Sequence, residues 1–151
     1  MGLSYNYAKL SGGGFQGLSW GLGFGMKRGL GFQYGISYLF EEGGDRWDLL
    51  FRVGLSYNWE DASGFVYYAR LGYTFDQISM PVEYITSKKD QMQHGWYGSA
   101  GALIPLFYSL YLLGEVSFVD LYPVPEAGDY ALVPGQRGFL FKVGLTYYFS
   151  L

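Results

Sequence analysis

The chain has 151 residues, which suits a single domain over 1–151; half of the residues are apolar and only 15% are charged. Soluble domains carry roughly a quarter charged residues, so we expect something other than water to face much of this surface. The net charge of −3 argues against nucleic acid as a partner, and the absence of cysteine excludes a disulfide framework and thiolate metal sites. The 24 glycines argue against a helical protein, because glycine in a helix interior costs about 1 kcal/mol relative to alanine.

The start of the chain already alternates between polar and apolar side chains. Met1 and Gly2 lead directly into the alternating run 3–7, with no secretory signal before it, and we interpret the sequence as a mature chain with an added start Met. No stretch approaches the ~18 unbroken apolar residues of a membrane helix. The longest candidate, 101–114, is interrupted by Pro105 and Ser109. A membrane protein with this sequence would therefore be a closed barrel.

Five segments place an apolar side chain at every second residue, which is the period of a β-strand. In chain order they are 18–26, 30–40, 47–59, 65–75 and 139–149. The intervening positions hold small, polar or charged residues, so each strand has one apolar face and one small or polar face. Three weaker strands are expected at 2–8, 96–104 and 108–118, the second of uncertain phase. The total of eight is even, as bacterial barrels require.

The connections between these strands alternate in length. The segments 27–29, 60–64 and 105–107 are short, whereas 77–95 and 121–138 are long. Short turns of outer-membrane barrels face the periplasm and longer loops face outward, which would place both termini in the periplasm. We therefore predict an all-β fold, a transmembrane antiparallel up-and-down β-barrel of about eight strands.

Aromatic residues gather near the strand ends and predict two girdles at the membrane interfaces. The girdle residues are Phe40, Trp47, Phe75 and Trp96 at one rim, and Trp59, Phe65, Tyr147 and Phe149 at the other.

A soluble, lipocalin-like barrel is the alternative fold, with the apolar face turned inward. Its outer face would then be the glycine and serine face, which carries too few charges for a soluble surface. Its interior would also have to hold more aromatic side chains than an eight-stranded lumen accommodates. We therefore favour the membrane barrel.

The residues 142–149 carry a polar residue, a glycine two positions later and then alternating hydrophobics that end in Phe. This pattern resembles the assembly signal of outer-membrane proteins, with Lys142, Gly144, Tyr147 and Phe149 at its positions, although two residues follow the Phe. The strand series over nearly the whole chain resembles the OmpA/OmpX-like outer-membrane β-barrel superfamily, as do the strand openings 14–18 and 64–68.

This resemblance implies a bacterial outer-membrane location, contact with membrane lipid and lipopolysaccharide, and recognition by the barrel-assembly machinery. The superfamily includes structural barrels, adhesins, small-solute channels and a few lipid A-modifying enzymes, so membership does not determine a function.

Charged residues on the inward face form the most informative set. Arg52 and Arg70 lie on adjacent strands, and Glu115 and Lys142 lie on another adjacent pair. Eight strands leave an interior just wide enough for side chains to fill, so we expect these groups to meet. A network that plugs the lumen is favoured over a gate or a narrow ion path, because buried charges persist only when paired.

The inward glycine and serine stripe from Gly17 to Gly25 also has two interpretations. The favoured one is that these small residues make room for large inward side chains, namely Tyr68, Tyr97, Tyr111 and Tyr148. The other is a ligand cavity along that wall.

His94 is the only histidine and falls in the long segment 77–95, near Ser87 and Asp90. A lipid A deacylase or palmitoyltransferase would use a serine with a histidine base at the outer rim. The order of residues here matches no such motif, so a solvated loop histidine is favoured. One histidine without clustered carboxylates also argues against a metal site, and no cofactor is expected.

The expected function is that of a non-enzymatic integral outer-membrane barrel with a structural or surface-interaction role. Its loops 77–95 and 121–138 would carry any contacts with a surface ligand. The first alternative is a small-solute or lipid-ligand channel, and the second is a lipid A-modifying enzyme that uses His94.

Overall fold

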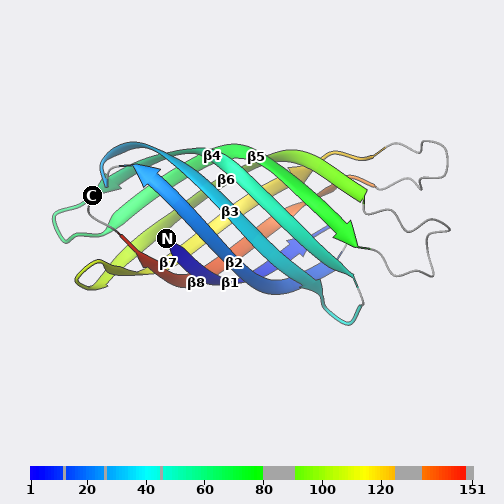
Figure 1. Ribbon diagram of the computed structural model, residues 1–151, viewed down its shortest axis with the longest axis horizontal. Coiled ribbons are helices and arrows are strands. Elements are labelled where there is room, and N and C mark those ends of the chain that lie inside the picture. The colour runs from blue at the N-terminus through cyan, green and yellow to red at the C-terminus, as the bar shows by residue number, and fades with distance from the viewer. Residues whose placement is uncertain (12, 26, 45, 80–90, 125–133, 149–151) are drawn as a thin grey trace.

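A computed structural model describes the whole chain except residues 12, 26, 45, 80–90, 125–133 and 149–151. Eight strands follow one another around a single closed barrel, each antiparallel to its neighbours (Figure 1). The strands are β1 (Gly2–Leu10), β2 (Gly13–Gly25), β3 (Gly29–Glu41), β4 (Trp47–Glu60), β5 (Val66–Ser79), β6 (Gln91–Phe107), β7 (Leu110–Leu121) and β8 (Gln136–Tyr147). The predicted up-and-down barrel of eight strands is therefore confirmed. Among the described residues, no helix is long and apolar enough to cross a membrane.

Pairing between the first and last strands closes the barrel. The register of β1 with β8 runs from Gly2 opposite Thr146 to Leu10 opposite Gly138. Closure gives each of the eight described strands a paired neighbour on both sides. Met1 and the last residues of β8 lie at the end of the barrel that carries the turns after β4 and β6 (Figure 1), which we call the turn end. The opposite end, where β5 and β7 end and β6 and β8 begin, is the loop end.

The two faces of the strands follow the predicted alternation. Leu55, Leu71 and Val143 point outward, with 61–66% of their surface exposed. Inward neighbours such as Ser37 and Ser117 are fully buried. The uncertain phase of β6 is also settled, because Tyr97, Ser99 and Leu103 are buried in the lumen and the alternate positions 98, 100 and 102 face outward.

The turn after β6 differs from the expectation. The sequence predicts a connection at 105–107, but β6 continues to Phe107 and the turn is formed by Tyr108 and Ser109. The register with β7 shifts between Pro105 and Phe107. Such a bulge tolerates a proline, which has no N–H for the ladder, and so the proline does not end the strand.

The two long loops are shorter than predicted. β5 continues to Ser79, β6 begins at Gln91 and β8 begins at Gln136, so parts of 77–95 and 121–138 are strand. The central parts of both segments, including Ser87 and Asp90, lie outside the described residues. The strands are longer than predicted because apolar alternation is required only where lipid covers the barrel. Beyond the apolar belt, polar residues can continue a hairpin.

Buried apolar side chains of the lumen form three clusters. Two lie towards the loop end: the first consists of Ala8, Leu10, Phe15, Leu39 and Leu140, and the second of Leu50, Tyr97, Val119 and Leu121. The third lies towards the turn end, on the β5–β7 side, and consists of Val66, Tyr68, Leu103, Tyr111 and Leu113, with Tyr148 packed against it.

The inward tyrosines pack against glycines other than those predicted. A Cβ atom on Gly72 would lie 2.8 Å from the Tyr97 ring, and one on Gly101 would lie 2.5 Å from the Tyr68 ring. At Gly23, by contrast, the nearest atom is a backbone oxygen at 3.8 Å. The favoured interpretation of the stripe from Gly17 to Gly25 is therefore wrong, and glycines of β5 and β6 receive the rings. Strand tilt and stagger decide which residues meet across a lumen, and alternation does not specify them.

Alanine substitution separates these two kinds of glycine. We expect Gly72→Ala to destabilise the barrel by about 1–3 kcal/mol, the usual cost of overpacking a filled core, because its methyl group would overlap Tyr97 and the backbone of Gly54. Gly23→Ala enters open space and should stay within about 1 kcal/mol of the wild type. A urea titration of both variants in lipid vesicles measures the difference, and equal losses would contradict the packing described here.

Candidate functional site

A single carboxylate collects the lumen charges at mid-height of the barrel. Glu115 projects inward from the middle of β7, with 1% of its side chain exposed. Lys142 lies directly opposite it on β8, with Nζ 3.0 Å from Oε1. Arg52 Nη1 lies 3.6 Å from the same oxygen, and Arg70 Nη1 donates a hydrogen bond to Oε2. The structure thus brings all four predicted lumen residues together.

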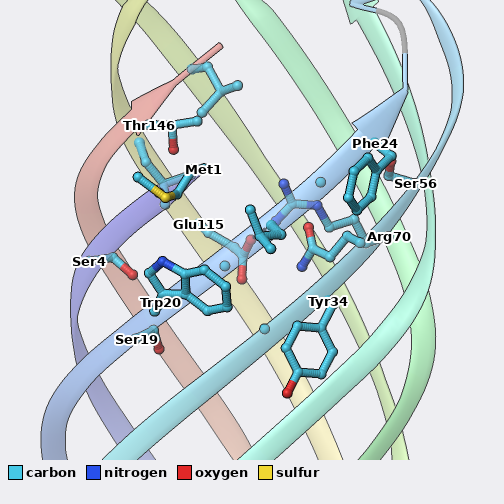
Figure 2. A pocket seen from close by; sticks show the side chains of 18 of the residues that line it. Met1, Ser4, Ser19, Trp20, Phe24, Tyr34, Ser56, Arg70, Glu115 and Thr146 are labelled. Atoms are coloured by element: carbon cyan, nitrogen blue, oxygen red, sulfur yellow. Dashed lines mark hydrogen bonds and ion pairs between the residues drawn. The ribbon is translucent and has the colours of Figure 1, made fainter. Parts of the chain in front are cut away.

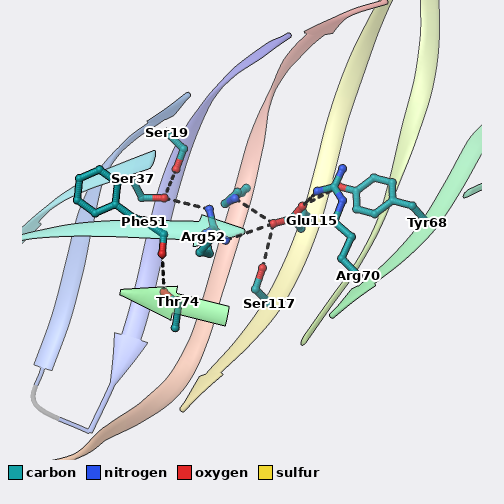
Figure 3. A network of polar contacts seen from close by, with 10 residues as sticks. Ser19, Ser37, Phe51, Arg52, Tyr68, Arg70, Thr74, Glu115 and Ser117 are labelled. Carbon is teal, nitrogen blue, oxygen red and sulfur yellow. Dashed lines mark hydrogen bonds and ion pairs between the residues drawn. The ribbon is translucent and has the colours of Figure 1, made fainter. Parts of the chain in front are cut away.

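Neutral side chains complete the hydrogen bonding of Glu115. The Tyr68 hydroxyl donates to Oε2 at 3.0 Å, and Ser117 Oγ donates to Oε1 at 2.9 Å. Figure 3 shows these donors converging on the carboxylate from different strands. Both oxygens are therefore satisfied, as a buried carboxylate requires.

The network continues from Arg52 on β4 to the neighbouring strands β3 and β2. Arg52 Nη2 donates to Ser37 Oγ at 3.0 Å, and the Ser37 and Ser19 hydroxyls are hydrogen-bonded (Figure 3). Sequence reasoning did not assign Ser19, Ser37 or Ser117 to the network. The alternation of the sequence does place these serines on the inward face, since Ser117, for example, lies two residues after Glu115 on the same strand face.

Aromatic rings fix the two guanidinium groups. The centre of the Arg70 guanidinium lies 3.6 Å from the centroid of the Tyr68 ring, and that of Arg52 lies 5.6 Å from the Tyr97 ring. A cation over a ring face is attracted by the ring quadrupole. Together with Lys142, which is paired with Glu115, these two arginines give the charged layer three cations around one carboxylate.

A cavity of about 470 Å³ lies on the turn side of this layer. Gly21, Gly23 and Gly35 form one wall, from β2 and β3. Arg70, Glu115 and Lys142 line its inner end, so that the charged layer forms the floor. Figure 2 shows Arg70 and Glu115 among the labelled lining residues, with Ser4, Ser19, Ser56 and Thr146 around them. The ligand cavity considered as the second interpretation of the glycine stripe is thus present as a space in the fold.

A second charged group lies nearer the loop end. Asp48 accepts two hydrogen bonds from Arg46, at 2.8 and 2.7 Å. Both carboxylate oxygens of Asp76 are buried and have no hydrogen-bond partner among the residues that the structure describes. These acids lie on the loop side of the Glu115 layer and do not contact its cations within 4 Å. No group of three potential metal-ligating side chains occurs in the described part of the chain.

The outer surface carries aromatic residues at both rims. Phe40, Phe75 and Trp96 are exposed towards the loop end, where Trp47 packs near Tyr38. At the turn end, Trp59 is exposed and stacks on Tyr67, which also stacks on Phe65. Tyr147 is exposed at the same end, and Phe149 lies outside the described residues. Leucine, valine and phenylalanine side chains cover the surface between the rims, and an apolar belt of this kind is suited to lipid.

No protein-family model and no curated protein matches the chain, but solved structures do. The outer membrane protein OprG from Pseudomonas aeruginosa superposes with a TM-score of 0.67 at 12% identity, over 99% of this chain and 94% of OprG. Ail of Yersinia pestis gives a TM-score of 0.62 at 12% identity, over 97% of this chain and 93% of Ail. The outer membrane enzyme PagL gives a TM-score of 0.59 at 13% identity, over 95% of this chain and 98% of PagL.

The chain has the fold of the small outer-membrane β-barrels. The predicted resemblance to that class is confirmed, and the apolar belt together with these neighbours supports the predicted location in the bacterial outer membrane. The neighbours differ in role, since one is an enzyme and another an attachment protein, and at this level of identity the likeness concerns the fold alone.

His94 of this outer-membrane barrel lies on a strand and not in a loop. It projects outward from β6, its ring stacks on Tyr73 at 5.8 Å and its Nδ1 is hydrogen-bonded to the Tyr73 hydroxyl. Tyr122 contacts the other side of the ring edge-on at 5.4 Å. The expected loop position is therefore wrong, because His94 belongs to β6 and, among the described residues, is part of an exposed aromatic group on the outer face.

The described residues that resemble an assembly signal occupy both faces of β8. Lys142 and Gly144 face inward, and a Cβ atom on Gly144 would overlap Ser4 of β1. Tyr147 faces outward and its backbone N–H donates to the carbonyl oxygen of Met1. The small residue at 144 therefore permits close pairing at the seam between β1 and β8.

Proposed function

We propose that this protein is a non-enzymatic outer-membrane barrel with an occluded lumen, which serves a structural or surface-interaction role. The observation that carries this proposal is the layer around Glu115, in which Arg52, Arg70 and Lys142 all lie within 4 Å of one carboxylate. Eight strands enclose an interior that side chains fill. Such a layer at mid-height leaves an ion no wide aqueous path.

The loop half of the lumen supports the same proposal. The apolar clusters around Phe15 and Leu39 and around Tyr97 and Leu121 lie above the charged layer. An ion would have to cross this apolar packing after leaving the cavity, and transfer of an unpaired charge into apolar surroundings is expensive.

Partner contacts are assigned to the outside of the barrel. The apolar belt would contact membrane lipid and lipopolysaccharide, and the seam strand β8 would be recognised by the barrel-assembly machinery. A surface ligand would bind through the segments that join β5 to β6 and β7 to β8, since these emerge at the loop end and loops of outer-membrane barrels are the part exposed to the exterior.

Single-channel recording in planar bilayers tests the occlusion. The wild-type protein should show no steady conductance, whereas Arg52→Ser, which removes a large side chain from the layer, should admit water and conduct. Arg137→Ser is the matched control, because Arg137 is 74% exposed and pairs with Asp120 across 3.7 Å at the rim. Large, steady conductance of the wild type would refute the proposal and favour the channel.

Mass spectrometry of lipid A tests the non-enzymatic part. Lipid A from cells with and without the protein should have the same acyl chains and the same mass. A mass change that disappears in the His94→Ala variant would instead support the lipid A-modifying enzyme.

A further inference from the structure

The charged layer of the lumen is not electrically balanced by the protein. Arg52, Arg70 and Lys142 share one salt-bridge partner, Glu115, in the described part of the chain. Arg52 and Lys142 are almost completely buried, and Arg70 is 84% buried, from a side-chain exposure of 16%. Three positive charges against one negative charge leave an excess of two in a layer that a membrane would surround.

Other carboxylates of the lumen do not remove this excess. Glu60 at the turn end is paired with Lys27 at 3.3 Å, and Asp48 is paired with Arg46. Asp76 lies on the loop side of the layer and has no cation within 4 Å among the described residues. Buried charges are retained in proteins when they are paired, so the layer favours an additional anion.

The cavity offers a place for such an anion at the right position. Lys142 and Arg70 line its inner end, and Arg70 Nε is buried there without a hydrogen-bond partner in the described structure. Lys142 is 94% buried, from a side-chain exposure of 6%, and uses its Nζ for Glu115 at 3.0 Å. An ammonium group has three donors, which leaves capacity for a further acceptor.

The remaining lining indicates what kind of anion would fit. Leu103, Leu113 and Tyr148 form an apolar side, and Gln33, Asn58 and Thr146 offer amide and hydroxyl groups nearer the turn end. The volume of about 470 Å³ is in the range of small-molecule sites. A guanidinium and an ammonium group at one end and apolar walls beside them suit a carboxylate attached to a small ring or short alkyl body.

We infer that the turn half of the lumen is a blind binding pocket for a small organic carboxylate. The carboxylate binds to Arg70 and Lys142 at the inner end, and the apolar body lies along the glycine wall of β2 and β3. The pocket reaches the ends of β1, β2 and β8 through Gly2, Gly25 and Thr146, so the ligand enters from the side of the turns.

Fluorine NMR of the refolded barrel in non-ionic detergent tests this inference, with 4-fluorobenzoate as the probe. We expect the probe to bind saturably and the neutral isostere 4-fluorobenzamide to bind at least about tenfold more weakly, a factor that corresponds to 1.4 kcal/mol. Detergent micelles without protein measure partitioning of both compounds. Inorganic phosphate as a competitor shows whether the site prefers a bare anion to a carboxylate with an apolar body.

Two variants change the pocket by different means. Lys142→Met removes one cation and leaves Glu115 paired with both arginines, so it should fold and weaken probe binding about tenfold or more. Gly23→Leu fills the cavity from the glycine wall, where a Cβ has 3.8 Å of space, and should abolish binding without any change of charge. Arg137→Met at the exposed rim should bind as the wild type does.

Several outcomes would overturn the inference. Equal binding of the benzoate and the benzamide would show an apolar pocket without anion selectivity. Wild-type affinity in both folded variants would place the probe outside the lumen, and displacement by equimolar phosphate would show a general anion site. Each outcome is independent of bilayer conductance, so failure here is distinguishable from failure of the occluded-barrel proposal.

Discussion

Replacement of Leu55 by arginine will destabilise the folded barrel by about 2–4 kcal/mol, the cost of a cation on the lipid face near the bilayer midplane. Leu55 points outward with 63% of its surface exposed. It is the next outward residue after Val53, which lies midway along β4 between Trp47 and Trp59. The free energy of unfolding of both proteins is measured by urea titration in lipid vesicles.

The matched control for this substitution is Gln33→Arg. Gln33 lies at the same level, opposite Gly54 on the neighbouring strand, but its side chain faces the cavity. The new guanidinium adds to the positive charge of the layer, but it can extend towards the turn end of the cavity and away from Arg70 and Lys142, so we expect a smaller loss than on the lipid face. An equal or larger loss for Gln33→Arg would show that the assignment of lipid and lumen faces is inverted.

The variant Glu115→Gln should lose about 3–5 kcal/mol, the scale for removing one partner of a buried ionic group. The substitution keeps the shape of the side chain and leaves Arg52, Arg70 and Lys142 without a counter-charge. Asp120→Asn on the same strand is the control, since its partner Arg137 is mostly exposed and such pairs contribute about 0–1 kcal/mol.

A double variant tests whether the loss arises from charge. Glu115→Gln combined with Lys142→Met removes one unpaired cation and should recover part of the stability lost in Glu115→Gln alone. Additive losses in this double-mutant cycle would mean that the two residues, which lie directly opposite each other at 3.0 Å, do not interact energetically.

Alternation alone predicts the strands and their faces because a membrane barrel imposes one rule on nearly every strand residue. Lipid accepts only apolar side chains, and the lumen accepts small and polar ones, so a period of two is visible directly in the sequence. The meeting of Glu115 with Lys142 follows from the same rule, because both face inward on adjacent strands.

Contacts across the lumen depend on the geometry of the barrel, which the alternation of apolar and polar residues in the sequence does not specify. The Tyr97 ring packs near Gly54 and Gly72, whereas the glycines at 21 and 23 face a cavity. Which of these arrangements occurs depends on the tilt and stagger of strands around the barrel. The contact of Ser37 with Arg52 is of the other kind, because both residues face inward on the adjacent strands β3 and β4.

Strand ends also differ from the expectation. The polar residues Gln93 and His94 interrupt the apolar pattern, which predicts a loop there, yet both belong to β6. The Gln93 amide donates to the carbonyl oxygens of Pro134 and Tyr122, at 2.9 and 3.3 Å, and so a polar side chain supports the hairpin beyond the apolar belt. Hydrophobic periodicity carries no information about such a position.

The seam between β1 and β8 has a consequence for how the protein folds. Gly2 pairs with Thr146 and Leu10 with Gly138, so the contacts that complete the sheet join residues at nearly the greatest separation the chain allows. Loop closure over such a distance carries a large entropic cost before the pairing offsets it, and folding slows as contact order rises. The β1–β8 ladder cannot form during synthesis until β8 has been made. Until then both seam strands present open edges and apolar faces, the features that promote aggregation, so we expect that a chaperone which holds the chain unfolded would raise the yield of folded barrel.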